Sequence, residues 1–240
     1  MADLPFAASA ELRRRLLPHL DVEGKIPRAL DALGPMGDRD VVLVDADRGL
    51  RARQLAALGA RVVALVTPDE LVSLERELSA AGPSGGITVA PGTASRTGLA
   101  TASADVVVGF WTCFRPNGEA ELVEAERVLR PGGRLLAVQD YARDDLAAFF
   151  PVDRSRELVA WSRRDGWYAT NGFRIHVVHA FWTFPNGGAM RDAVAGAFGS
   201  EAAGLLADRH RPRLSWKVVV YHRTREGLDL PAGGPAAGSA

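Results

Sequence analysis

Two aspartates and a glycine follow the first strongly apolar segment of the sequence. Residues 41–44 are all apolar, and Asp45, Ala46, Asp47, Arg48 and Gly49 come directly after them. Helical spacing over 50–58 makes this stretch a strand-to-helix turn, where α/β domains bind nucleotides. There a carboxylate can attract a cation, and a glycine lets a ligand approach the backbone. Aspartates in such a turn also cap helices and stabilise the turn itself, so the residue types fit a structural role as well.

A second group of candidates follows two later strands, expected over 105–110 and 134–139. Its members are Trp111, Cys113, Phe114, Asp140, Tyr141 and Arg143. Parallel strands end at a common edge of a sheet where ligands bind, so these residues could line one substrate pocket. The aromatic rings would suit an apolar substrate, and Asp140 or Tyr141 would supply a polar group to bind it. For Trp111 and Phe114 packing under a loop is the alternative. Cys113 has no evident partner base and is expected to be a buried small hydrophobe.

The histidines do not form a metal site. His176 and His179 are three residues apart in an expected strand, so their side chains point to opposite faces and cannot bind one ion together. His222 lies near the end of another expected strand and fits a structural role. There is no Cys/His cluster, so the sequence predicts no zinc site.

The elements that must position these residues alternate over the first 140 residues. Helices are expected over 9–20, 25–33, 50–58, 68–81 and 119–129, and strands over 41–44, 61–66, 87–90, 105–110 and 134–139. This alternation indicates a parallel sheet with right-handed crossovers. Helical patterns over 153–164 and 189–208 then accompany two long strands, 173–184 and 214–223. Together they predict an α/β fold whose seven-stranded sheet is mainly parallel, with one antiparallel strand near an edge.

Length and composition indicate one α/β domain with additions. The chain has 240 residues, of which 47% are hydrophobic. We expect N-terminal helices over 1–36, the α/β domain over 37–225 and a disordered tail over 226–240, because this tail is rich in Gly, Pro and small residues.

Charge and cysteine usage restrict the partners. Lys plus Arg and Asp plus Glu number 29 each, so the net charge is zero and nucleic acid is not expected as the main partner. The single cysteine excludes an intrachain disulfide and fits a reducing, cytoplasmic setting. Neither a signal peptide nor an apolar run of about 20 residues is present, so no membrane span is expected.

The most specific segment is ADVVVGFWTCFRPNGEAELVEAERVLRPGGRLLAV, residues 104–138. It predicts a strand, a loop, a helix ended by Pro131, a turn at Gly132 and Gly133, and another strand. This order resembles the class I S-adenosylmethionine-dependent methyltransferases, in particular the type 11 branch that acts on small molecules. The resemblance covers about residues 36–141, and the two long C-terminal strands resemble that family's sixth and seventh strands. A dinucleotide-dependent dehydrogenase would instead need G-x-G-x-x-G after the first strand, which this chain lacks.

The resemblance implies a Rossmann-like fold and an S-adenosylmethionine site with three features, from which this chain departs. The glycine-rich turn after the first strand becomes Asp45, Asp47 and Gly49. Gly49 matches the last glycine of the motif, whereas a register shifted by two residues makes Asp45 the family's acid and puts Arg51 on a glycine position. Val66 stands where an acid should hold the ribose hydroxyls.

Two further positions bear on the cofactor. Asp69 and Glu70 follow the ribose position and offer a substitute acid after a shift of the loop. Thr93 replaces the acid that the family places near the adenine, within Gly92-Thr93-Ala94 instead of Gly-Asp-Ala. Lys25 precedes the first strand, where this family often closes its site.

These departures leave two functions open. Losing a charge-assisted ribose contact, worth about 1.5–3 kcal/mol, could weaken binding about tenfold to a hundredfold. Asp45 or Asp47 could instead attract the cofactor's sulfonium. One hypothesis is therefore a small-molecule methyltransferase with a remodelled or weakened cofactor site. The other is a methyltransferase-fold protein without catalysis, which serves as a ligand-binding or interaction module.

Overall fold

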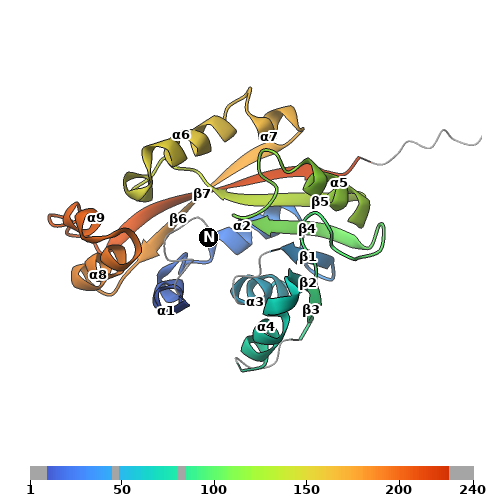
Figure 1. Ribbon diagram of the computed structural model, residues 1–240, viewed down its shortest axis with the longest axis horizontal. Coiled ribbons are helices and arrows are strands. Elements are labelled where there is room, and N and C mark those ends of the chain that lie inside the picture. The colour runs from blue at the N-terminus through green and yellow to red at the C-terminus, as the bar shows by residue number, and fades with distance from the viewer. Residues whose placement is uncertain (1–9, 45–48, 81–84, 227–240) are drawn as a thin grey trace, which may run out of the picture.

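A single seven-stranded sheet organises the protein (Figure 1). The computed structural model describes residues 10–44, 49–80 and 85–226. The strands are β1 (Asp40–Val44), β2 (Arg61–Val66), β3 (Ile87–Pro91), β4 (Ala104–Phe110), β5 (Leu129–Asp140), β6 (Arg174–Thr183) and β7 (Arg213–Thr224). Their order is β3-β2-β1-β4-β5-β7-β6, and β7 runs antiparallel to both of its neighbours. The predicted mainly parallel sheet is thus confirmed.

Helices cover both faces of the sheet. They are α1 (Ala10–Leu16), η2 (Leu17–His19), α2 (Lys25–Leu33), α3 (Leu50–Ala56), α4 (Pro68–Ala80), α5 (Glu119–Val128), η3 (Leu146–Phe149), α6 (Val152–Trp161), α7 (Trp167–Thr170), α8 (Gly187–Phe198) and α9 (Ser200–Gly204). One core lies under α1 to α4 and α8, and a second lies under α5 to α7. Figure 1 shows α6 and α7 above the sheet and α1, α3 and α4 below it. No helix in the described part is long and apolar enough to cross a membrane.

The continuous apolar run of β1 follows from its central place. Val41 pairs with Val62 on one side and with Val106 on the other, so both edges of β1 are hydrogen-bonded. Both faces are covered as well, since Leu43 packs in one core and Val42 in the other. A parallel strand buried on both faces must be apolar at every position, which is why this segment does not alternate.

The Arg-Pro-Gly-Gly segment differs from its prediction in one respect. It was expected as a turn that precedes a strand at Arg134, but β5 already begins at Leu129, which pairs with Ala104. The ladder resumes at Arg134 beside Val106, so the segment is an irregularity within the strand. Gly133 allows it, because a Cβ there would lie 2.8 Å from the Arg130 carbonyl oxygen. Two backbone hydrogen bonds, one donated from each side, join Arg225 to this segment. They hold the irregular residues against the sheet.

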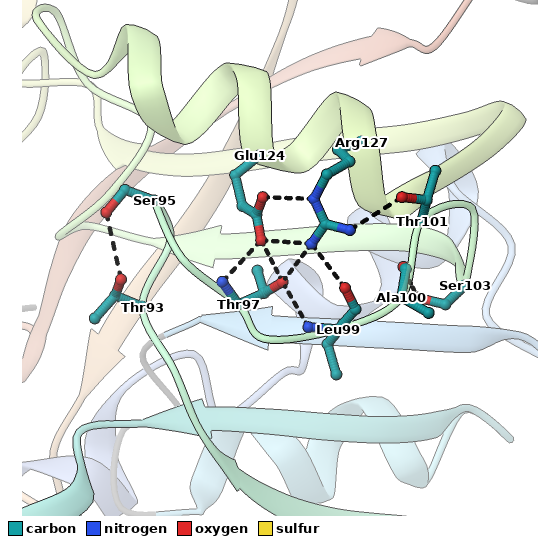
Figure 2. A network of polar contacts seen from close by, with 9 residues as sticks. All are labelled: Thr93, Ser95, Thr97, Leu99, Ala100, Thr101, Ser103, Glu124 and Arg127. Atoms are coloured by element: carbon teal, nitrogen blue, oxygen red, sulfur yellow. Dashed lines mark hydrogen bonds and ion pairs between the residues drawn. The ribbon is translucent and has the colours of Figure 1, made fainter.

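No helix joins β3 to β4 along residues 92–103, all of which the structure describes. A polar network fastens this connection to α5 instead (Figure 2). Glu124 accepts hydrogen bonds from the Thr97 backbone N–H at 2.9 Å and from its hydroxyl at 2.6 Å. Arg127 pairs with Glu124 and donates to the Leu99 carbonyl at 2.7 Å. The hydrogen-bonded Arg127 guanidinium lowers the pKa of Glu124 to about 2.

Candidate functional site

The carboxyl ends of the parallel strands form the edge where the sequence places the site. β1 ends at Val44 beside Leu65 of β2 and Gly109 of β4. The predicted cofactor residues Asp45 and Asp47 come next and lie outside the described residues. This edge is therefore described from the residues on either side of that turn.

Gly49 begins α3 with φ +83°, in the left-handed region that glycine adopts at little cost. A Cβ at this position would lie 2.8 Å from Leu78 Cδ2. A side chain here would face α4, and the positive φ together with this contact favours glycine whether or not a ligand binds.

Val66 ends β2 and is half-buried against the apolar core. The nearby acid Glu70, a possible substitute for the missing ribose ligand, is already engaged. Its carboxylate accepts a hydrogen bond from the Thr67 hydroxyl at 2.8 Å and one from the Thr67 backbone N–H at 3.4 Å. This is a capping contact at the start of α4. Asp69 is exposed, with no partner found within the described residues.

Thr93 lies in a tight turn after β3. Its backbone exchanges two hydrogen bonds with Arg96, at 3.0 and 3.1 Å. Its hydroxyl lies 3.3 Å from the Ser95 hydroxyl, within the same turn (Figure 2). The side chain is exposed at the expected edge, and its polar contact is local.

A buried arginine at this edge was not singled out as a site residue. Arg51, in the first turn of α3, is 1% exposed. Its guanidinium lies 5.0 Å from the Phe110 ring centroid and 5.1 Å from that of Trp111, and it donates to Gln54 at 2.8 Å. The sequence placed Arg51 on a glycine position in one register, but nothing in its pattern indicated burial.

Asp21 supplies negative charge near this arginine. Burial raises the pKa of Asp21, whereas hydrogen bonds from the Ile26 and Lys25 backbone N–H groups and the charge of Arg51 lower it. Those two bonds, at 2.8 and 2.9 Å, also cap α2. A buried guanidinium is stabilised by a nearby negative charge. Asp21, just before α2, therefore interacts electrostatically with Arg51 at this edge of the sheet.

The structure brings two predicted pocket residues, Trp111 and Asp140, together through Trp216. The Trp111 and Trp216 rings stack with centroids 5.8 Å apart, and the Trp216 indole N–H donates to Asp140 at 2.9 Å. Trp182 packs edge-on against Trp216 at 6.2 Å. All three indoles are buried, and burial raises the pKa of Asp140. Neither Trp216 nor Trp182 is among the pocket residues that the sequence indicates.

Cys113 and Phe114 pack on the opposite face, under α5 and α7. Gly109 makes room for them, because a Cβ there would lie 2.3 Å from Cys113 Sγ. The buried Gln139 amide donates to the Cys113 carbonyl at 3.0 Å, and the Tyr168 hydroxyl donates to the Phe114 carbonyl at 2.7 Å. The six predicted pocket residues therefore do not line one continuous surface.

The loop after β5 carries the remaining predicted pocket residues. Arg143 is exposed, and its guanidinium lies 5.0 Å from the ring of the half-buried Tyr141. Two carboxylates fasten this loop to β7: Asp144 accepts from the Lys217 backbone N–H, and Asp145 from that of Ser215 at 2.7 Å. Burial raises the pKa of Asp144 to about 6, against the opposing effect of its backbone hydrogen bonds.

Lys25 belongs to the junction between α2 and β6. Its ammonium donates to the His179 carbonyl at 3.0 Å, lies 4.8 Å from the Phe181 ring centroid and pairs with Glu23. His176 and His179 are both exposed, and no metal-binding cluster occurs within the described residues.

The central part of the chain matches a known protein family. Residues 46–137 match the family model described as a methyltransferase domain. This segment is similar to that family, and the chain shares the fold of class I methyltransferases. A comparison with curated proteins found no match.

Solved structures with low sequence identity share the fold. A chain of the complex between the Haloferax volcanii Trm112 methyltransferase activator and a methyltransferase is 16% identical, with a TM-score of 0.56 over 90% of this chain and 95% of that one. The [4+2]-cyclase SpnF is 13% identical, with a TM-score of 0.55 over 85% and 82%. Geranyl diphosphate methyltransferase in complex with SAM is 16% identical, with a TM-score of 0.52 over 85% of each chain.

Proposed function

We propose that this protein is an S-adenosylmethionine-dependent methyltransferase that acts on a small molecule and binds its cofactor weakly. The matched methyltransferase domain supports the reaction class, and a similar structure is a complex with SAM. The observation that carries the weakened site is the end of β2. Val66 cannot accept from ribose hydroxyls, and Glu70 is bonded to Thr67 at the start of its own helix.

The described residues do not fit the cofactor as the family binds it. Neither Val66 nor Thr93 supplies the expected carboxylate, and the Thr93 hydroxyl has a local partner. The buried Arg51 adds a cation at the edge where a sulfonium would have to lie, so the two positive charges oppose each other. Asp21 compensates part of the Arg51 charge, whereas Asp45 and Asp47 add side chains at positions where the family has glycine.

A small-molecule acceptor is proposed from the resemblance, on the side of the sheet formed by β5 to β7. Trp111, Trp182 and Trp216 are buried in the core, and the Trp216 indole holds the buried Asp140 at the end of β5. These four residues therefore fix the end of β5 from inside the protein. Tyr141 and Arg143, which follow Asp140, are more accessible and would contact the acceptor, positioning it rather than activating it.

A ligand-binding module without methyl transfer is the second candidate. It rests on the same missing carboxylates and on the likeness to a [4+2]-cyclase, since one fold can carry different activities. The two candidates differ in whether this chain binds S-adenosylmethionine at all.

Calorimetric titration with S-adenosylmethionine and its demethylated product tests the proposal. We expect weak binding by the wild type and at least about tenfold tighter binding by the triple variant Asp45→Gly, Asp47→Gly, Val66→Asp, since each change removes a different obstacle. Val72→Asp, at an exposed position of α4, is the matched control and should leave affinity unchanged.

Each possible result separates the candidates. Tight binding by the wild type contradicts a weakened site. Equal measurable binding by wild type and triple variant shows that the site lies elsewhere. Absence of binding by both, with normal melting curves, favours the ligand-binding module.

A further inference from the structure

Four basic side chains gather on β5, β7 and β6, away from the carboxyl edge of the parallel strands. They are Arg134 of β5, His222 of β7, and Arg174 and His176 of β6, and we call them the basic cluster. Arg134 pairs with Val106 near the start of β4, and Arg174 and His176 lie on the edge strand β6, four strands away from β1, after which the proposed cofactor turn follows. The basic cluster is therefore separate from the site described above.

Strand register places the four side chains on one face. His222 pairs with Leu136 of β5 and with Arg174 of β6. Arg134 and His176 are each two residues from a member of that row, so all four share its face. Arg174 and His222 are directly paired in antiparallel strands, where paired residues lie about 5 Å apart. Arg134 and His176 lie on either side of this pair along the strands, and the charges of Arg134, His176 and Arg174 all act on His222. Arg134 also donates to the hydroxyl of its paired residue, Thr224.

No carboxylate within the described residues forms an ion pair with this cluster. Elsewhere the arginines at strand starts are neutralised, as Arg61 and Arg130 are by Asp40. α2 reaches this face at Gly34 and carries Arg28 and Asp31, and the Asp31 carboxylate accepts from the Met36 backbone N–H at 2.9 Å.

The repulsion within the cluster is visible at His222. Burial lowers the pKa of this half-buried imidazole, and the charges of Arg134, His176 and Arg174 lower it further. A bound anion would offset that repulsion and favour the protonated imidazole.

We propose that the basic cluster binds the phosphate group of a small molecule. A guanidinium presents paired N–H donors that match phosphate oxygens, and a protonated histidine adds a charge-assisted donor. Arg174 and His176 are exposed and available to a ligand, while Arg134 and His222 form the half-buried floor. This site is independent of the cofactor site and of the proposed methyl transfer.

Calorimetric titration of the full chain with pyrophosphate at low ionic strength and pH 6 tests the site. Arg174→Gln and His176→Gln should each weaken binding roughly tenfold, in line with the loss of one charge-assisted contact. Arg164→Gln removes an exposed arginine elsewhere and should bind as the wild type does. Equal weakening by all three variants, or no binding at millimolar pyrophosphate, would overturn the proposal.

Histidine NMR signals locate the ligand and separate two sources of phosphate. Pyrophosphate should shift the ring signals of His176 and His222 but not those of His210, and raising the pH from 6 to 8 should weaken binding several-fold as His222 loses the proton that a bound anion favours. Unmoved His176 and His222 signals would overturn the assignment. Cosedimentation with phosphatidylcholine vesicles that contain phosphatidic acid, without any response to pyrophosphate, would replace the small molecule by a lipid surface.

Discussion

The two halves of the sheet differ in what holds them together. In the proposed cofactor half, β1 to β3, Val66 and Thr93 stand where the resemblance implies acids, and the connection to β4 is a loop held by Glu124 and Arg127. In the proposed acceptor half, β5 to β7, the buried Trp182 and Trp216 pack with Trp111, which follows β4. The fold does not depend on acids at positions 66 and 93, because apolar packing stabilises it.

Truncating a central aromatic should produce the largest effect. Trp216→Ala removes a fully buried ring and the hydrogen bond to Asp140, so we expect the free energy of unfolding to fall by about 3–5 kcal/mol. Leu74→Ala, at a buried position of α4 in the cofactor half, should cost only about 2–3 kcal/mol. Urea denaturation of both variants measures the difference, and an equal or greater loss at Leu74 would contradict the contrast between the halves.

Asp144 should make the acceptor half less stable as the pH rises. Its folded pKa, about 6, exceeds the usual 3.8, so the folded state retains the proton between these values and the unfolded state releases it. Stability from this group is therefore present below pH 3.8 and is lost as the pH rises to about 6, an effect of about 2 kcal/mol after allowance for partial exposure.

Asp144→Asn should remove that part of the pH dependence. Denaturation at several values between pH 4 and pH 7 should show the variant gaining about 2 kcal/mol on the wild type over this range. Asp153→Asn on α6, where the acid is fully exposed, serves as the control and should leave the profile unchanged. A parallel profile for Asp144→Asn would show that its carboxylate is ionised without penalty.

Glu124 should act with the opposite sign in the cofactor half. Its folded pKa, about 2, lies below the usual 4.5, so its stabilisation is present above pH 4.5 and is lost as the pH falls towards 2. Glu124→Gln should destabilise by about 1–2 kcal/mol at pH 7 and by little near pH 2. Thermal melting at both pH values measures this, with the exposed Glu119→Gln as the control; a constant difference would refute the charge-based explanation.

Removal of the tail should have the smallest effect. Residues after 227 offer mainly small side chains to a core, so a chain ending at Gly227 should melt within a degree or two of the full chain. A large fall in melting temperature would show that this segment, which lies outside the described residues, contributes to the domain.

Local pattern was sufficient for most of the fold. β2 and α2 occupy their predicted residues, and β7 has the predicted antiparallel role, because apolar periodicity and the Pro and Gly positions act within a few residues along the chain. The start of β5 was wrong by five residues. A turn signal in the sequence cannot show that strand pairing resumes on both sides of it.

The sequence by itself determined the class of fold, the resemblance to methyltransferases and the absence of acidic residues at positions 66 and 93. These depend only on which residue stands at which position along the chain. Only the tertiary structure decided which side chains meet. It turned Glu70 onto Thr67, separated Cys113 from Trp111 across the sheet, and buried Arg51 near Asp21. Burial and long-range charge depend on segments far apart in the sequence, and no local pattern encodes those distances.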